Sequence, residues 1–413
     1  MTTVSGLRTV HRSPRPYEAA LDRFADDLFG HLPRADQRRW AHAYLRGLLL
    51  CPGRKSPRRM AAALREPRTA ADSLRQFVNQ SPWDWAPART RLAHRALDHR
   101  ATAHPAPPAA WVVDLAVVPK SGRASAGVHR RRVPHLGRTV TCQLATGLFL
   151  ATGPLALPVE WRLFVDREWA ADEVRRAKAK VPDGIAHRTP EDHVPELAAW
   201  AAAHSPAPVL PLVASLKDVP HTAALVARMN QHDVRFVVEV GPGQPVLLDP
   251  PRPGSRAGRA AAWSGAISAR DALRLAGRRR IRQFRPGGDH REPHPVATLT
   301  ADVRLPGPPD AATGPARGAY RLLARQSTAP SAPRYWLTNV TGADPEDVLA
   351  LAGLLPRAQE SVRVLGEDFG LLDFEGRSFP GWHHHMTLVS AAYGFRLMED
   401  RDRPHDGDRR PTA

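Results

Sequence analysis

The sequence contains very little cysteine and no long hydrophobic run. Two cysteines among 413 residues, Cys51 and Cys142, exclude a disulfide scaffold and a zinc site built from cysteines. The most apolar stretch, 139–161, is interrupted by glycine and proline, so no segment reaches the roughly 20 apolar residues that a membrane span requires. The first residues lack the apolar core of a secretory signal. These absences predict a soluble, cytoplasmic protein.

Acidic residues are also few relative to basic ones. The chain has 59 Lys and Arg against 41 Asp and Glu, which gives a formal net charge of +18 and a pI near 11.1. Such an excess favours a polyanionic partner, most often nucleic acid. Proline is abundant, with 41 residues where the usual share of ~5% would give half as many. A genomic preference for Arg, Ala and Pro codons is the alternative explanation of both counts.

Hydrophobic periodicity divides the chain into a helical part and a mixed part. Residues 17–100 have a helical pattern, which is clearest where Trp40, Tyr44 and Leu48 recur every four residues. The stretch 101–110 is rich in Pro and Ala and predicts a linker. Apolar, β-rich runs then predict strands over 111–120, 139–151 and 159–166.

The second half of the chain continues this mixed pattern. A β-α-β unit is predicted over 208–241, and further strands over 296–305 and 334–340. Two helices follow, from about Pro345 and from about Trp382 to Leu397. We divide the chain into a helical N-terminal part (1–100), the linker (101–110), two parts of an α/β core (111–250 and 331–399), a Pro- and Arg-rich β insertion between them (251–330), and a disordered tail (400–413).

Several motifs occur in order and carry a resemblance to a known family. They include WVVDLAVVPKSGRASAGVHRRR from Trp111, WRLFVDREWA from Trp161 and FEGRSFPGWHHHMTLVSAAYGF from Phe374. The chain resembles bacterial insertion-sequence transposases of the DDE superfamily, in the branch whose third motif precedes a Trp-His-rich C-terminal helix. The resemblance implies an α/β, ribonuclease H-like core with a helical N-terminal domain and a β-rich insertion. It also implies DNA as partner and Mg²⁺ as cofactor.

The catalytic triad of the family is degenerate in this sequence. The first acid corresponds to Asp114, at the end of the first predicted strand. The stretch LVASLKD (212–218) places Val213 at the second acid, and counting back from FEGRS places Gln359 at the third. Two-metal phosphodiester chemistry needs several carboxylates, so we expect no bound metal. Only displaced acids, Asp218 or Glu360, would replace those that are lost.

Basic residues gather in three clusters that predict contacts with the DNA backbone. The N-terminal cluster comprises Arg38, Arg39, Arg46, Arg54, Lys55, Arg58 and Arg59. The loop cluster, after the first strand, comprises Lys120, Arg123, Arg130, Arg131, Arg132 and Arg138. The insertion cluster comprises Arg278, Arg279, Arg280, Arg282 and Arg285.

Three consecutive histidines, His383, His384 and His385, invite a metal interpretation. Adjacent helical side chains are about 100° apart, however, so the three cannot share one ion. The resemblance implies instead that they pack and form hydrogen bonds.

Three functional hypotheses follow from the sequence. The first is a domesticated, catalytically inactive transposase-like protein that binds DNA in a regulatory or architectural role, on the bacterial nucleoid. The second is an active DDE transposase with displaced carboxylates. The third is a ribonuclease H-like scaffold with a different role in a specialised pathway. All three allow a homo-oligomer.

Overall fold

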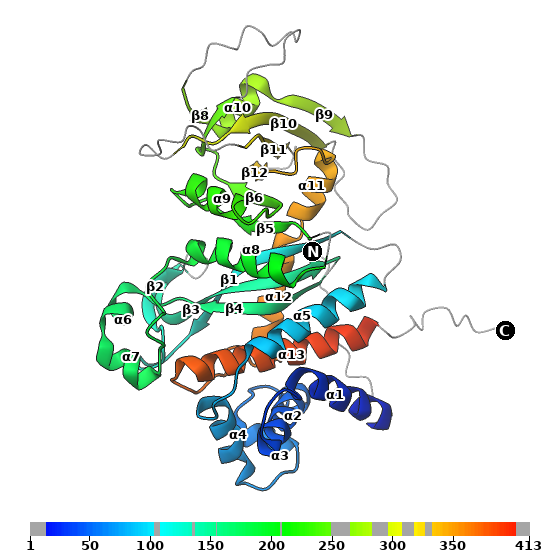
Figure 1. Cartoon of the computed structure of the whole chain (residues 1–413), viewed down its shortest axis with the longest axis vertical. Helices are drawn as coiled ribbons and strands as arrows, with labels where there is room; N and C mark the ends of the chain where they lie inside the picture. Colours follow the sequence, from blue (N-terminus) through cyan, green and yellow to red (C-terminus); the bar gives the residue numbers. More distant parts are fainter. Residues whose placement is uncertain are drawn as a thin grey trace, which may run out of the picture.

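The computed structural model describes residues 14–102, 108–133, 137–153, 155–206, 209–248, 265–282, 296–307, 318–326 and 333–401. Figure 1 shows a helical N-terminal part at one end, a sheet in the middle and further strands at the other end. Within these residues no helix has both the length and the apolar character to cross a membrane.

The N-terminal part consists of helices, as the periodicity predicts. They are α1 (Pro14–Phe29), α2 (Ala35–Leu50), α3 (Pro57–Ala63), α4 (Ala70–Asn79) and α5 (Ala86–Ala101). Tyr44 and Leu48 of the predicted stripe are buried, and Trp40 packs partly buried beside them. The start of α3 follows from its sequence, because Ser56 accepts a hydrogen bond from the Arg59 backbone and Pro57 occupies the first turn.

The core is a mixed sheet whose strand order confirms the ribonuclease H-like expectation. The first strands are β1 (Ala109–Pro119), β2 (His129–Val133), β3 (Arg138–Thr152), β4 (Leu155–Leu163), β5 (Leu212–Ser215) and β6 (Phe236–Val240). β3 pairs antiparallel with both β1 and β4, while β1, β5 and β6 are parallel neighbours. The predicted β-α-β unit is β5, α9 (Thr222–Asn230) and β6. β1 begins at Ala109, inside the stretch predicted as a linker.

Helices connect β4 to β5 and lie at one end and on one face of the sheet (Figure 1). They are α6 (Arg167–Ala171), α7 (Glu173–Ala179), the short helix η2 (Pro190–Asp192) and α8 (His193–His204). Asp166 and Asp172 cap α6 and α7 by accepting hydrogen bonds from backbone N–H groups three residues later.

Strands of the predicted insertion (251–330), together with one strand of the predicted core on each side of it, extend the same sheet. They are β7 (Pro245–Leu248), β8 (Ile267–Ser268), β9 (Arg278–Arg282), β10 (Val296–Arg304), β11 (Tyr320–Gln326) and β12 (Arg334–Thr338), with α10 (Ala269–Ala276) packed against them. β12 pairs with β6, β11 with β12 and β10 with β11, which continues the sheet beyond its core strands. The 251–330 boundaries remain a prediction, because they fall outside the described residues.

The C-terminal helices join the sheet to the N-terminal part. They are α11 (Pro345–Ala352), α12 (Leu355–Asp368) and α13 (Phe379–Arg401). α12 packs on β1 and β4, and α13 lies between the sheet and the N-terminal helices, where it contacts α2, α4, α5 and β4 (Figure 1). The last helix, α13, begins three residues before the predicted Trp382 and ends four residues after the predicted Leu397. It includes the first two residues of the predicted tail, and 402–413 lie outside the described residues.

Candidate functional site

The sequence-predicted catalytic positions lie on one face of the sheet, which α12 covers. Asp114 is in β1, and Val213 is in the parallel neighbour β5, opposite Val112. Side chains two residues apart in a strand point to the same face, so Val112 and Asp114 share a face with Val213. Gln359 comes from α12, which packs on both strands. The fold thus brings three distant segments to one place.

Asp114 is half-buried, and its environment disfavours the charged form. Its Oδ1 accepts a hydrogen bond from the Leu115 backbone N–H at 2.8 Å. Its Oδ2 is shielded from solvent and has no hydrogen-bond partner of good geometry among the described residues. Burial raises the pKa of Asp114 to about 6, against the opposing effects of the Leu115 N–H and the nearby Gln359 side chain. The carboxyl therefore holds its proton more tightly than an exposed aspartate does.

The other two positions hold neutral side chains in different surroundings. Gln359 is exposed, with its side chain near the Asp114 carboxyl. Val213 is fully buried at 0% exposure and is part of the hydrophobic core. The structure therefore brings Asp114 and Gln359 together, as expected. Val213 lies on the same face, but it is opposite Val112 rather than Asp114 and packs in the hydrophobic core.

The two displaced acids considered from the sequence, Glu360 and Asp218, are both exposed. Glu360 accepts hydrogen bonds from the Arg363 guanidinium at 2.6 and 3.0 Å on the exposed side of α12. Arg363 also lowers the pKa of Glu360. Asp218 is exposed in the loop after β5. Throughout the described ranges, no three His, Cys, Asp or Glu residues lie close enough to hold a metal ion together.

Two neighbouring polar residues escaped the sequence analysis. Glu239 of β6 is 7% exposed and forms an ion pair with Arg334 of β12, whose Nε donates to Oε1 at 2.7 Å. Ser215, at the end of β5, donates its hydroxyl hydrogen to Oε2 of the same carboxylate at 2.8 Å. A carboxylate inside the apolar run VRFVVEVG was the signal available in the sequence. Its partner Arg334 is about a hundred residues away, so no local pattern connects them.

The three consecutive histidines are structural, which confirms the packing interpretation. All three are buried, and burial lowers the pKa of each, to about 4 for His384 and about 3 for His385. They point into different surroundings. Their hydrogen-bond partners are Arg89 for His383, the carbonyl oxygens of Val78 and Trp83 for His384, and Tyr44 and the Gly370 carbonyl for His385.

The N-terminal basic cluster is largely engaged within the protein, so it does not form one free surface. Lys55 is only 6% exposed, and its ammonium donates to the Cys51 carbonyl. Burial also lowers its pKa, so the expectation that Lys55 contacts phosphate is wrong. Four other members have internal partners: Arg38 the Leu32 carbonyl, Arg39 Glu66, Arg46 Glu18, and Arg54 Asp373 and Glu375. Arg58 and Arg59 are exposed at the start of α3.

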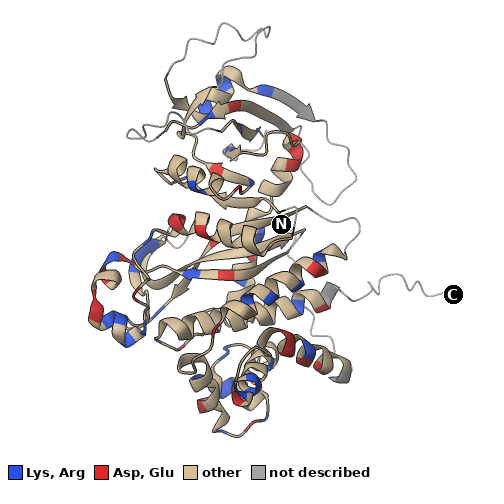
Figure 2. Ribbon diagram, in the orientation of Figure 1, with Lys and Arg blue, Asp and Glu red and all other residues tan. Residues whose placement is uncertain are grey.

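The loop cluster contains several exposed cations on and beside one strand. Arg130 and Arg132 are exposed on β2 and lie opposite Thr141 and Thr139 of β3, so their side chains share one face of the sheet. Arg131 between them is half-buried, and Arg123 and Arg138 are exposed nearby. No ion pair joins Arg130, Arg131 or Arg132 to another described residue. Figure 2 shows this basic strand beside the mixed charges of α6 and α7.

Lys120 differs from the rest of the loop cluster. Its ammonium donates to the Phe374 carbonyl at 2.7 Å, and burial lowers its pKa to about 8. This contact holds the loop after β1 against the FEGRS segment, where the Ala126 N–H also donates to the Arg377 carbonyl at 2.9 Å. Lys120 therefore has a structural role, and its expected role in binding DNA stays a prediction.

The insertion cluster is only partly described. Arg278 is exposed at the start of β9. Arg279, Arg280 and Arg282 lie in the same strand, but their side chains are outside the described part of the chain, as is all of Arg285. Their role in DNA binding stays a prediction.

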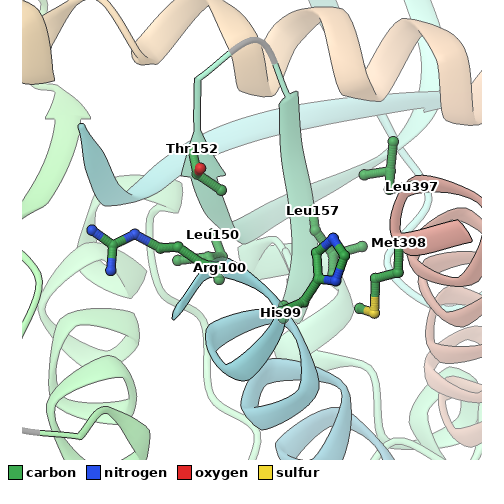
Figure 3. Close-up of a pocket in the computed structure, with 8 residues that line it drawn as sticks. His99, Arg100, Leu150, Thr152, Leu157, Leu397 and Met398 are labelled. Carbon is green, nitrogen blue, oxygen red and sulfur yellow. The ribbon is translucent and has the colours of Figure 1, made fainter. Parts of the chain in front are cut away.

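A small cavity of about 40 Å³ lies elsewhere in the molecule, between the ends of α5, β3, β4 and α13 (Figure 3). Ala96, Leu150, Leu157, Leu397 and Met398 make its lining mainly apolar, and the Arg100 guanidinium points away from Leu397 and Met398. Asp114 and Gln359 are not among its lining residues. The cavity is therefore separate from the candidate site.

Comparison with known proteins identifies the family. The model of the DDE superfamily endonuclease family matches residues 27–286, well over half of the chain. This range includes β1 with Asp114 and β5 with Val213, and ends before α12. No curated protein matches the chain. The match, together with the sheet topology, shows that this transposase-like chain belongs to the DDE superfamily of endonucleases.

Proposed function

We propose that this protein binds duplex DNA in a regulatory or architectural role on the bacterial nucleoid and has lost metal-dependent strand transfer. The observation that carries the proposal is the sheet face under α12. In the family three acids converge there, whereas here Asp114 lies beside the amide of Gln359, and Val213 on the same face is apolar and buried.

The donor set on this face does not fit the two Mg²⁺ ions that the family implies. Two divalent ions carry four positive charges, and their mutual repulsion must be offset by several carboxylates. Asp114 supplies one such group, and its Oδ2 lacks a partner among the described residues. Glu239 is already neutralised by Arg334. We therefore derive no cleavage step for this chain.

Binding to DNA is supported by the exposed arginines of β2. Phosphate contacts need cations that are accessible and not already paired with protein carboxylates. Arg130 and Arg132 meet both conditions on one face of an edge strand, with Arg123 and Arg138 close by. Such contacts would recognise the phosphate backbone without specifying a sequence.

A salt titration of DNA affinity tests this proposal. With six or so phosphate contacts, affinity for a labelled duplex should fall about 10³-fold between about 50 and 200 mM salt, with a log–log slope of about −0.9 per contact. Fluorescence anisotropy measures the slope for the wild type and for Arg130→Ala/Arg131→Ala/Arg132→Ala. The triple variant should flatten the slope by up to about three units.

A control variant removes the same charge elsewhere. Arg34, Arg75 and Arg363 are exposed but each pairs with a carboxylate on its own segment, so Arg34→Ala/Arg75→Ala/Arg363→Ala should keep the wild-type slope. Equal slopes for the wild type and the β2 variant would contradict the proposal. That result would favour a scaffold with a role unrelated to DNA.

A further inference from the structure

A row of polar side chains crosses the sheet at the carboxyl ends of the parallel strands. Ser215 of β5 lies opposite Glu239 of β6, and the hydrogen bond between them shows that both face the same side. On the far side of Glu239, the Arg334 guanidinium completes the row. Ser215, Glu239 and Arg334 each have a partner within the row.

The register of β1 against β5 places Asp114 at the other end of this row. The paired residues are Trp111 with Leu212, Val112 with Val213, and Val113 with Ala214. Continuing by one residue puts Asp114 opposite Ser215. Neighbouring strands are about 4.8 Å apart, so Ser215 is the nearest β5 side chain on the Asp114 side of the sheet. Val213 lies two residues before Ser215 in β5 and is fully buried.

We infer that Ser215, rather than Val213, occupies the place across from Asp114 where a second metal-binding carboxylate would stand, and that the Arg334 guanidinium is the resident positive charge of this face. The inference deepens the proposed loss of metal-dependent cleavage and concerns the same residues. It moves the position of the second acid from Val213, where the sequence motifs placed it, to Ser215, two residues later.

The chemistry of the row explains why a serine suits this place. A carboxylate at position 215 would stand beside both Asp114 and Glu239, and three acids on one face repel one another unless a cation offsets them. A serine hydroxyl instead donates to Glu239 and removes one negative charge. Arg334 then balances the carboxylate that remains, with its Nε directed at Oε1.

Rebuilding the acids tests the assignment. We compare Ser215→Asp/Gln359→Glu with Val213→Asp/Gln359→Glu and with the wild type, and titrate each with Mn²⁺ alone, following the free ion by electron paramagnetic resonance. The Ser215 variant should bind Mn²⁺ with a dissociation constant on the order of 10⁻³ M or tighter, as for a weak oxygen-ligand site. The Val213 variant and the wild type should bind about tenfold more weakly or not at all.

A second pair of variants tests the same assignment without a buried charge, because an aspartate at the buried position 213 would destabilise the folded protein. Ser215→Cys/Gln359→Glu and Val213→Cys/Gln359→Glu change volume little, and Cd²⁺ bound to a thiolate gives a charge-transfer absorption. The band should appear for the Ser215 variant and be absent for the Val213 variant, which carries the same buried Cys51 and Cys142.

The outcomes separate this inference from the proposed function. Metal binding by the Val213 variants and not by the Ser215 variants would overturn the assignment of Ser215, and would leave DNA binding and the loss of cleavage untouched. Binding of Mn²⁺ by the wild type at comparable strength would overturn the role of Arg334 and contradict the proposed loss of the metal site. Binding by neither set of folded variants would overturn the inference as a whole.

Discussion

Arg89 of α5 and Glu160 of β4 form an ion pair in the interior of the protein, with side chains 1% and 5% exposed. The remaining N–H groups of Arg89 also have acceptors, so the buried guanidinium is fully satisfied. These acceptors are Thr387 Oγ1 at 2.8 Å, the Trp161 carbonyl at 3.2 Å, and the Nδ1 and carbonyl oxygen of His383 at 3.1 and 3.0 Å. One side chain therefore ties the N-terminal helices to both the sheet and α13.

Replacing Arg89 should strongly destabilise the whole chain. Arg89→Met leaves Glu160 buried with Arg162 as its remaining ion-pair partner. Breaking a buried pair costs at most about 3–5 kcal/mol. Arg95→Met on the same helix is the control, because Arg95 pairs with Asp27 at the surface and such pairs are worth about 0–1 kcal/mol. Urea unfolding measures both. Equal losses for the two variants would show that the buried pair has no special role.

The stability of the protein should depend on pH through Asp114. Its folded pKa of about 6 lies above its ordinary value of 3.8, so the folded state binds this proton more tightly than the unfolded state. The contribution of Asp114 to stability is therefore greatest below about pH 4 and is lost as the pH rises to about 6. At pH 7 the loss amounts to at most about 3 kcal/mol.

Asp114→Asn should remove this dependence. The variant should unfold at higher urea concentration than the wild type at pH 7 and at a similar concentration at pH 4, since the amide never ionises. Asp218→Asn, in the exposed loop after β5, should change neither value. A difference between Asp114→Asn and wild type that stays constant with pH would contradict the raised pKa.

An exposed cation and a cation bonded within the protein should differ in their effect on DNA affinity. Lys120→Met should leave the salt slope unchanged, because the ammonium is committed to the Phe374 carbonyl. Arg130→Ala should flatten the slope by about 0.9 if Arg130 contacts one phosphate. Anisotropy titrations on the two single variants decide the point. A flatter slope for Lys120→Met, with the fold intact by circular dichroism, would return Lys120 to the DNA interface.

Most of the fold could be predicted from the sequence, because local pattern and the family motifs agreed. The helical N-terminal part, the strand that contains Asp114 and the β-α-β unit all follow from hydrophobic period. The expected position of Asp114 at the end of that strand was wrong, because β1 continues to Pro119. The continuity of the sheet through β10, β11 and β12 did not, since strand pairing between distant segments leaves no local signal. The burial of Arg89 could not be predicted either, because its sequence neighbourhood resembles that of any surface arginine.

The candidate site was only partly predictable for a related reason. Asp114 and Gln359 were located through motifs and meet in the structure. The register between β1 and β5, which brings Ser215 opposite Asp114, is set by hydrogen bonds between strands that are nearly a hundred residues apart. The basic clusters were predicted from composition, yet composition cannot show that Lys55 is buried and Lys120 half-buried while Arg130 and Arg132 are exposed.

The most direct test of the account is whether the protein cuts DNA to which it is bound. Purified protein is incubated with supercoiled plasmid and Mg²⁺ or Mn²⁺, at a salt concentration where anisotropy shows binding, and nicked and linear products are separated by electrophoresis. We predict that the plasmid stays supercoiled, as it does with Asp114→Ala. Metal-dependent nicking by the wild type that Asp114→Ala abolishes would contradict the loss of cleavage, and with it the account of this site.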